Sequence, residues 1–277
     1  MIKSLIKGLL GLFLPAFVAY LVSLFENPWL TWLVAVLGYL VSAFIFRANL
    51  LTAVGCRVYN SNPEKGIKIL RLAYSTGKLT AQNQLMYAYI IIRYGLLDEA
   101  ETVINKALVL GRHVLTDSEV MASDFNKALI TWKRGDLSSA IVQLEELYEA
   151  GYKTSAFFGS LGSFYLLNKE YDKALSLARE GVEYDREDLV SRDNLGQAYL
   201  ELGMLSEAQE VYEELIPMGP SFIEAYYNYG SVLEKRGSLE EAKKFYGLAL
   251  TYEEKYLSTI SLETVNEAYE RVCELVI

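Results

Sequence analysis

The feature that most constrains this chain is an alanine that returns every 34 residues. It closes four short segments of similar character, at 135–140, 169–174, 203–208 and 237–242. A fifth copy at 95–100 lies 40 residues before the next one, so about six residues are inserted near 111–120. A fixed period of this length predicts a stack of similar units, each of which contacts its neighbours.

Each unit is expected to be a pair of helices that cross closely. Small residues recur where the two helices would meet, which are the periodic alanines and Gly162, Gly196 and Gly230. Other glycines stand where a helix would end in a left-handed residue, at Gly135, Gly203 and Gly237. Asp136 and Ser238 are expected to cap the helices that follow. The chain is therefore predicted to be all-α.

Further positions match a known family. Leu161-Gly162 with Tyr165, and Leu195-Gly196 with Tyr199, repeat the pattern L-G-x-x-Y in the first helix of a unit. With the 34-residue period, this pattern resembles the tetratricopeptide repeat family, whose units are helix–turn–helix pairs. The resemblance implies a right-handed α-solenoid over residues 47–256. Its six units would be 47–80, 81–120, 121–154, 155–188, 189–222 and 223–256.

The C-terminal region, 257–277, is predicted to hold one more amphipathic helix over residues 261–276. Its apolar side chains recur at helical spacing, at Leu262, Val265, Tyr269, Val272 and Val276. A solenoid needs a terminal helix to cover its last apolar face, so a capping helix is one expectation. A detachable binding segment is the other.

Residues 1–46 form a separate region that is almost free of charge. The stretches 8–25 and 28–46 contain no charged residue, and each is long enough to cross a hydrocarbon core of about 30 Å. Only Glu26 and Asn27 lie between them, and Pro28 suits a first helical turn. We expect a transmembrane helical hairpin, with residues 28–60 as one continuous helix that holds the solenoid rigidly against the bilayer.

Basic residues lie at the two ends of the predicted hairpin and are absent from its turn. Lys3 and Lys7 precede the first span, and Arg47 and Arg57 follow the second, whereas the turn carries Glu26. The positive-inside rule then places both ends, and the solenoid, in the cytoplasm. The expected location is a bacterial plasma membrane.

Three other interpretations of residues 1–46 stay open. A cleaved signal peptide lacks support because no A-x-A-like site follows Phe25 and a second apolar stretch begins at once. A hairpin buried in a soluble fold would need helices without charge on any face. A hairpin that enters only one leaflet is favoured by Pro15 in the middle of the first stretch.

The composition argues against catalysis, metal binding and nucleic-acid binding. His113 is the single histidine, and Cys56 and Cys273 are the only cysteines, so no tetrahedral zinc site can be formed within one chain. The net charge is −9 and acidic residues dominate after residue 120, which is unsuited to phosphate backbones. We expect no enzyme activity, no cofactor and no small-molecule substrate.

The resemblance also implies a concave groove lined by the first helix of each unit. The apolar half nearer the membrane would contain Leu85, Tyr89, Ile92, Phe125, Leu129 and Trp132. The polar half would contain Gly159, Ser163, Asp193, Gln197, Tyr227, Ser231 and Glu234. Some of these side chains could instead pack against a neighbouring unit.

The chemistry of this groove favours one class of partner. Some family members bind a free carboxylate through basic groove residues, but the matching positions here are Gly159, Asp193 and Tyr227. An apolar or basic helix or extended segment of a protein fits better. The expected function is a membrane-anchored adaptor or scaffold. The alternative is an assembly factor or accessory subunit that binds its partner through the hairpin.

Overall fold

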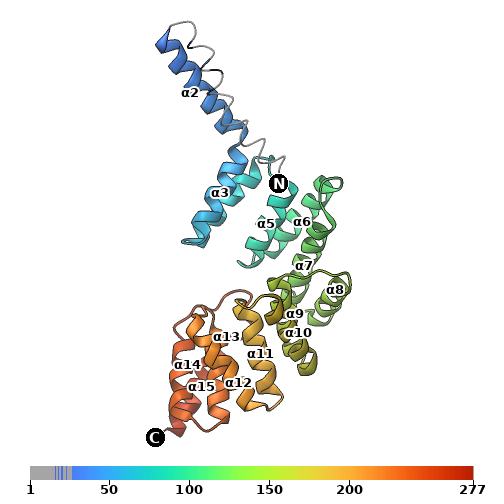
Figure 1. Cartoon of the computed structure of the whole chain (residues 1–277), viewed down its shortest axis with the longest axis vertical. Coiled ribbons are helices and arrows are strands. Elements are labelled where there is room, and N and C mark those ends of the chain that lie inside the picture. Colours follow the sequence, from blue (N-terminus) through green and yellow to red (C-terminus); the bar gives the residue numbers. More distant parts are fainter. Residues whose placement is uncertain (1–15, 17, 19, 21–22, 24–26, 277) are drawn as a thin grey trace. The chain divides into compact units, whose positions relative to one another are not determined.

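The computed structural model describes Ala16, Val18, Tyr20, Ser23 and residues 27–276. The regular elements within this part of the chain are all helices (Figure 1). They form two compact units, which are the described residues up to Ile90 with Asn105–His113, and Ile91–Ile104 with the residues from Val114 onward. The predicted first membrane span lies largely outside the described residues.

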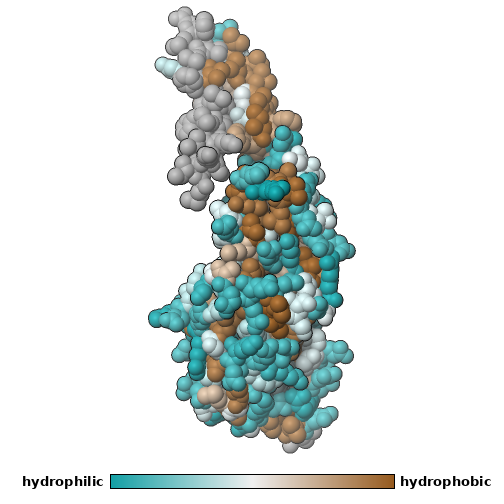
Figure 2. All heavy atoms as spheres, turned by 90° about the vertical axis from the view of Figure 1, so that its right-hand side faces the viewer, coloured by the Kyte–Doolittle hydropathy of each residue, from teal (hydrophilic) through white to brown (hydrophobic). Residues whose placement is uncertain are grey.

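Helix α2, Pro28–Ile45, is the predicted second apolar stretch. Pro28 occupies its first turn, and the Oδ1 atom of Asn27 caps it by accepting a hydrogen bond of 3.1 Å from the Leu30 amide. None of its residues is buried, and the part of the helix that Figure 2 leaves visible is mostly hydrophobic. It is the one helix among the described residues that is long and apolar enough to cross a membrane.

The expected continuous helix over 28–60 is wrong in detail. It is interrupted by a turn at Phe46, after which α3 runs from Arg47 to Tyr59. The Phe46 ψ angle of 9° falls outside the helical region, although the Phe46 amide still donates to the Ser42 carbonyl. The sequence 28–60 contains no proline after Pro28 that would mark this break.

The remaining helices follow in pairs. They are α4 Pro63–Ser75, α5 Ala81–Ile92, α6 Leu97–Gly111, α7 Asp117–Lys133, α8 Leu137–Glu149, α9 Ser155–Leu167, α10 Tyr171–Tyr184, α11 Leu189–Glu201, α12 Leu205–Leu215, α13 Ile223–Lys235 and α14 Leu239–Ala249. A short 3₁₀ turn, η1 Ile216–Met218, follows α12, and α15 is Leu262–Leu275. From α3 to α14, each predicted unit therefore supplies two helices.

Half of the insertion near 111–120 is helical. It extends α6 to Gly111 and starts α7 at Asp117, leaving a short turn that contains His113. Thr116 and Glu119 form a reciprocal capping box, in which Oγ1 of Thr116 accepts from the Glu119 amide and Glu119 accepts from the Thr116 amide. This S/T-x-x-E signature sets the start of α7 ahead of the predicted boundary at 120/121.

The turn inside each helix pair needs a left-handed residue. Gly135, Gly203 and Gly237 have φ angles of 96°, 75° and 83°, as expected from the repeat. Asp136 caps α8 by accepting from the Ser139 amide, as predicted, whereas the side chain of Ser238 makes no capping bond. In the pair α9–α10 the equivalent position is Lys169, with a φ angle of 61°.

Lys169→Gly should therefore stabilise the repeats. A residue with a Cβ atom loses about 1 kcal/mol or more in this conformation, and glycine does not. The reverse change at the equivalent turn, Gly203→Lys, should destabilise by a similar amount. Urea unfolding of both variants, followed by far-UV circular dichroism, checks the opposite signs. A loss of stability in Lys169→Gly would contradict the role assigned to the φ angle.

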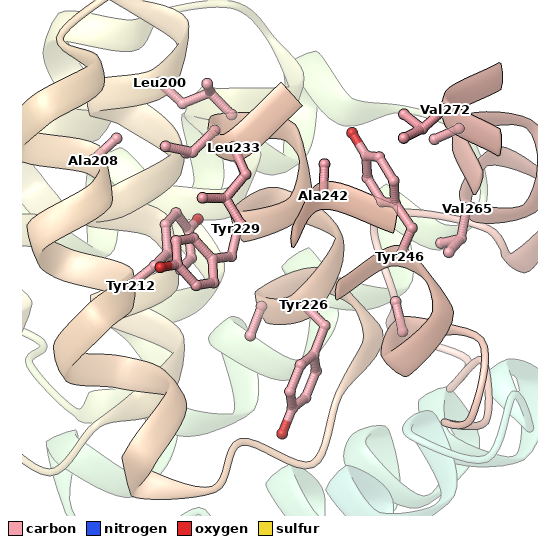
Figure 3. Close-up of a cluster of buried hydrophobic side chains, with 14 of the residues drawn as sticks. Leu200, Ala208, Tyr212, Tyr226, Tyr229, Leu233, Ala242, Tyr246, Val265 and Val272 are labelled. Carbon is pink, nitrogen blue, oxygen red and sulfur yellow. The ribbon is translucent and has the colours of Figure 1, made fainter. Parts of the chain in front are cut away.

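The first and second helices of a unit touch through glycine. A Cβ atom on Gly196 would lie 2.6 Å from the ring of Tyr212, and one on Gly230 would lie 2.7 Å from the ring of Tyr246. Both tyrosines are fully buried. Figure 3 shows the rings of Tyr212 and Tyr229 side by side, with centroids 5.6 Å apart. The predicted close approach of the paired helices is confirmed at these glycines.

Helix α15 packs on the last pair, α13 and α14. Val265, Ala268 and Val272 of α15 are buried in the same hydrophobic cluster as Ala242 and Tyr246, and Figure 3 shows the Tyr246 ring pointing toward Val272. The predicted helix over 261–276 is present with slightly shorter bounds, and its apolar face covers the end of the stack.

Candidate functional site

The first helices of the last two pairs, together with α15, enclose a cavity of about 850 Å³, here named the distal groove. Its walls come from α11, α13, one side chain of α14, the start and middle of α15, and the residues just before α15. The lining residues are Gln197, Leu200, Glu201, Tyr227, Asn228, Ser231, Glu234, Lys235, Tyr246, Thr259, Ile260, Ser261, Thr264 and Arg271. Most of these residues are polar or charged, and the rings of Tyr227 and Tyr246 with Ile260 add apolar surface, so the groove offers both hydrogen bonds and apolar contacts.

The predicted site residues of the distal half come together here. Gln197 on α11 and Tyr227, Ser231 and Glu234 on α13 all line the distal groove. Ser231 is held in place, because its Oγ atom donates to the Tyr227 carbonyl at 3.0 Å and contacts the Tyr246 hydroxyl at 3.1 Å. These side chains are half-buried, which leaves part of each accessible from the groove.

Gly159 is buried within α9, and five further predicted groove residues are also buried and unavailable to a partner. Their exposed fractions are 9% or less, namely Leu85, Ile92, Phe125, Leu129 and Asp193. For the apolar four, the groove assignment is corrected because helix packing within the solenoid removes the same side chains from water. Asp193 is also buried, because it lies at the centre of the hydrogen-bond network described below.

The other predicted residues lie apart from the distal groove lining. Trp132 on α7 is half-buried, with its ring 4.7 Å from that of Phe164 and 4.0 Å from the Lys133 ammonium. Ser163 donates to the Gly159 carbonyl at 2.8 Å and contacts Asn194 at 3.0 Å, so it supports the stack. Tyr89 is half-buried on α5, in the first compact unit.

The strongest electrostatic contact of the groove joins Glu234 of α13 to Arg271 of α15. The guanidinium meets both carboxylate oxygens, through Nε at 2.9 Å and Nη2 at 2.8 Å. The Tyr246 hydroxyl donates to the same carboxylate at 2.6 Å. These hydrogen bonds, Arg271 foremost, hold the pKa of Glu234 below its ordinary value, and burial raises the pKa of Tyr246.

Behind the groove wall, Asp193 is the centre of a buried network. Its Oδ1 atom accepts hydrogen bonds from the Tyr212 hydroxyl at 3.0 Å and from the Asn228 amide at 3.2 Å. Burial raises the pKa of Asp193 from 3.8 to about 7, and the Glu224 carboxylate adds to the rise, while Asn228 and Tyr212 oppose it. Both asparagines link neighbouring pairs, since Asn228 donates to Asp193 and Asn194 donates to the Gly159 carbonyl at 2.8 Å.

Several groove residues were missed from the sequence. The missed residues belong to the C-terminal region, which the sequence predicts to be either a capping helix or a detachable binding segment; they are Arg271, Thr259, Ile260, Ser261 and Thr264. One signal in the sequence was Arg271. The apolar face of this helix is formed by Val265, Ala268 and Val272, and a cation next to that face can pair with an acidic residue of the groove.

The described residues offer little to a metal or to covalent chemistry. They contain no cluster of three or more histidine, cysteine and acidic side chains that could hold a metal ion. Burial raises the pKa of the Cys56 thiol, whose Sγ atom contacts the Met86 sulfur at 3.9 Å, and a raised pKa lowers the thiolate fraction.

Comparisons with known proteins agree with this geometry. The family model named Tetratricopeptide repeat matches residues 125–187 and 194–251. The two matched segments of the solenoid are similar to tetratricopeptide repeats. Tetratricopeptide repeat proteins bind protein or peptide partners, and the groove of this chain lies within the matched segments and the C-terminal region that follows them.

Two curated relatives from Bacillus subtilis are similar over part of their length. The chain is 24% identical over 117 residues to the TPR repeat-containing protein YpiA, and 28% identical over 136 residues to the TPR repeat-containing protein YvcD. These matches cover 42% and 47% of this chain but 28% of each relative.

A solved structure supports the fold over most of the chain. It is a tetratricopeptide repeat protein from Parabacteroides merdae, which superposes with a TM-score of 0.59 at 12% identity. The superposition covers 87% of this chain and 92% of that one. At this identity the likeness shows the all-helical solenoid fold and nothing about the partner.

Proposed function

We propose that this protein is a membrane-anchored adaptor that binds a segment of a partner protein in the distal groove. The observation that carries the proposal is the convergence of Gln197, Tyr227 and Ser231 on one open cavity of about 850 Å³. A cavity of this size accommodates a few residues of a peptide, and amides and hydroxyls on its walls can bond a peptide backbone. Binding without catalysis is part of the proposal.

The groove chemistry favours an extended segment with polar or basic side chains. Arg271 is already engaged with Glu234, whereas Glu201 on the same wall is exposed at the end of α11. An acidic body with a net charge of −9 attracts basic segments over longer distances. A free carboxylate terminus is a poorer fit, because Glu234 already occupies the Arg271 guanidinium and leaves Lys235 as the second cation of the lining to bind it.

Membrane anchoring is supported by α2 and by its flanks. The helix is 18 residues long, fully unburied and apolar. Arg47 and Arg57 follow it, which favours a cytoplasmic position for the repeats under the positive-inside rule. Two spans, with residues 8–25 as the first, and a bacterial plasma membrane complete the proposal.

Capture from solubilised membranes tests the groove assignment. Gln197→Ala/Tyr227→Ala should reduce the recovery of a crosslinked partner at least tenfold, because it removes two groove side chains. The matched control is Gln209→Ala/Tyr184→Ala, which changes the same residue types on α12 and α10, outside the groove lining. Equal recovery by both double variants would reject the groove and favour binding through residues 1–46.

A further inference from the structure

The segment that joins α14 to α15, residues 251–261, is here named the strap. It contains no helix, and it returns across the stack rather than turning directly into α15. The Tyr256 ring lies 3.0 Å from the place where a Cβ atom on Gly95 would stand, in the turn between α5 and α6. The Ser258 carbonyl accepts a long hydrogen bond of 3.4 Å from Lys133 at the end of α7.

The strap also contacts α13 and the residues just before α13, through Tyr252, Lys255 and Thr259. The rings of Tyr252 and Tyr226 stack at 4.9 Å, and their hydroxyls are 3.0 Å apart. Lys255 donates to the Ser221 carbonyl at 2.7 Å, and the Thr259 amide donates to Oε1 of Glu224 at 2.8 Å. Glu224 is 9% exposed, so this backbone contact takes place at a nearly buried carboxylate.

These contacts connect repeats that are not neighbours in the stack. In a solenoid each unit packs only against the next, so two other units separate the third predicted unit from the sixth, and three separate the second from the sixth. One segment touches all three, and Lys133 and Glu224 both belong to first helices. The strap therefore crosses the side of the stack that first helices line, and its residues Thr259, Ile260 and Ser261 form part of the distal groove wall.

The strap also uses the groups through which an extended peptide would be bound. The Lys133 ammonium donates a hydrogen bond to a backbone carbonyl of the strap and lies 5.2 Å from the centre of the Tyr256 ring. The Glu224 carboxylate accepts a hydrogen bond from a backbone amide of the strap. Burial lowers the pKa of Lys133, and the carboxylates of Glu224 and Glu254 oppose that shift. Hydrogen bonds to the main chain at Ser258 and Thr259, with the Tyr256 ring held shortly before them, are the kinds of contact that hold a bound extended segment.

We propose that the strap is an internal ligand of this groove, which an extended partner segment with a basic residue followed by an aromatic one displaces. The proposal rests on the groove function given above and adds the chemistry of the partner. Displacement joins the Trp132–Lys133 surface to the distal groove as one longer site. An internal ligand seated about nine-tenths of the time weakens the apparent affinity of a competitor about tenfold.

The test uses the full chain in detergent and a fluorescein-labelled synthetic peptide of residues 251–261. Lys255→Ala/Tyr256→Ala, which loosens the strap, should bind this peptide at least tenfold more tightly than the unaltered protein. The control Glu253→Ala changes an exposed strap residue and should bind like the unaltered protein. Adding Lys133→Met to the loosened variant should reverse the gain. Far-UV circular dichroism confirms that each variant is folded.

The internal-ligand proposal is overturned if the unaltered protein and the loosened variant bind the peptide equally tightly. It is also overturned if neither of them binds the peptide. A second measurement avoids strap variants. Saturating the unaltered protein with the labelled peptide should accelerate hydrogen exchange in residues 252–260, and unchanged exchange at saturation contradicts displacement. Tight peptide binding by the loosened variant, combined with no partner captured from membranes, would leave the strap proposal standing and reject the adaptor function.

Discussion

Gly196→Ala is expected to destabilise the solenoid by about 3 kcal/mol. The added Cβ atom would lie 2.6 Å from a ring carbon of Tyr212, which is fully buried and cannot swing away. The Tyr212 hydroxyl is also held by the side chain and carbonyl of Asp193. Overpacking at a fixed ring forces the two helices apart, and the usual cost reaches this size. Urea unfolding followed by circular dichroism measures the loss.

Gly247→Ala provides the matched control for this prediction. Gly247 is also inside a helix, but its added Cβ atom would lie 3.4 Å from the nearest atom of Tyr269, an ordinary contact. Alanine is the better helix former, so this variant should gain up to about 1 kcal/mol. If both substitutions changed stability in the same direction, the packing role of Gly196 would be refuted.

The second large effect is a dependence of stability on pH that comes from Asp193. Its pKa is about 7 in the folded protein against an ordinary value of 3.8, so the folded state binds this proton more tightly. The resulting stabilisation is complete below pH 3.8 and is lost as the pH rises through about 7. Between pH 5 and pH 8 the loss should be about 2–3 kcal/mol.

Comparison with Asp193→Asn isolates this contribution. Other carboxylates act in the opposite direction, because the pKa values of Glu234 and Glu180 are lowered in the folded state. Their effects cancel when the unfolding free energies of the unaltered protein and the variant are subtracted at each pH. As the pH rises from 5 to 8, the unaltered protein should lose stability relative to Asp193→Asn. A difference in unfolding free energy that stays constant over this range would exclude a raised pKa at Asp193.

Much of the fold could be predicted because residue types recur in the repeat wherever the local structure requires them. A left-handed turn, a close helix crossing and a capping side chain each demand particular residue types, as at Gly135, Gly196 and Asp136. Lys169 shows the limit of this reasoning, since the fold imposes the left-handed conformation there without a glycine. The start of α7 depends on a capping box that the period does not contain, and no proline marks the break at Phe46.

The site was less predictable than the fold. First helices line the groove, but the repeat does not tell which of their residues face a neighbouring helix, and Phe125 and Leu129 do so. The polar residues Gln197, Tyr227 and Ser231 were identified because polar side chains stay at the surface more often. The strap and Arg271 lie outside the period, so their return across the stack could be found only in three dimensions.

The central claim is that the partner is bound in the distal groove, and site-specific photocrosslinking tests it most directly. A benzoyl-phenylalanine placed at position 201 lies on the groove wall, and one at position 210 lies on α12 outside the groove lining, with both positions exposed glutamates in the natural chain. Irradiation of intact cells should give a partner adduct at position 201 and none at position 210. Adducts at position 210 alone, or only at positions within α2, would contradict the claim.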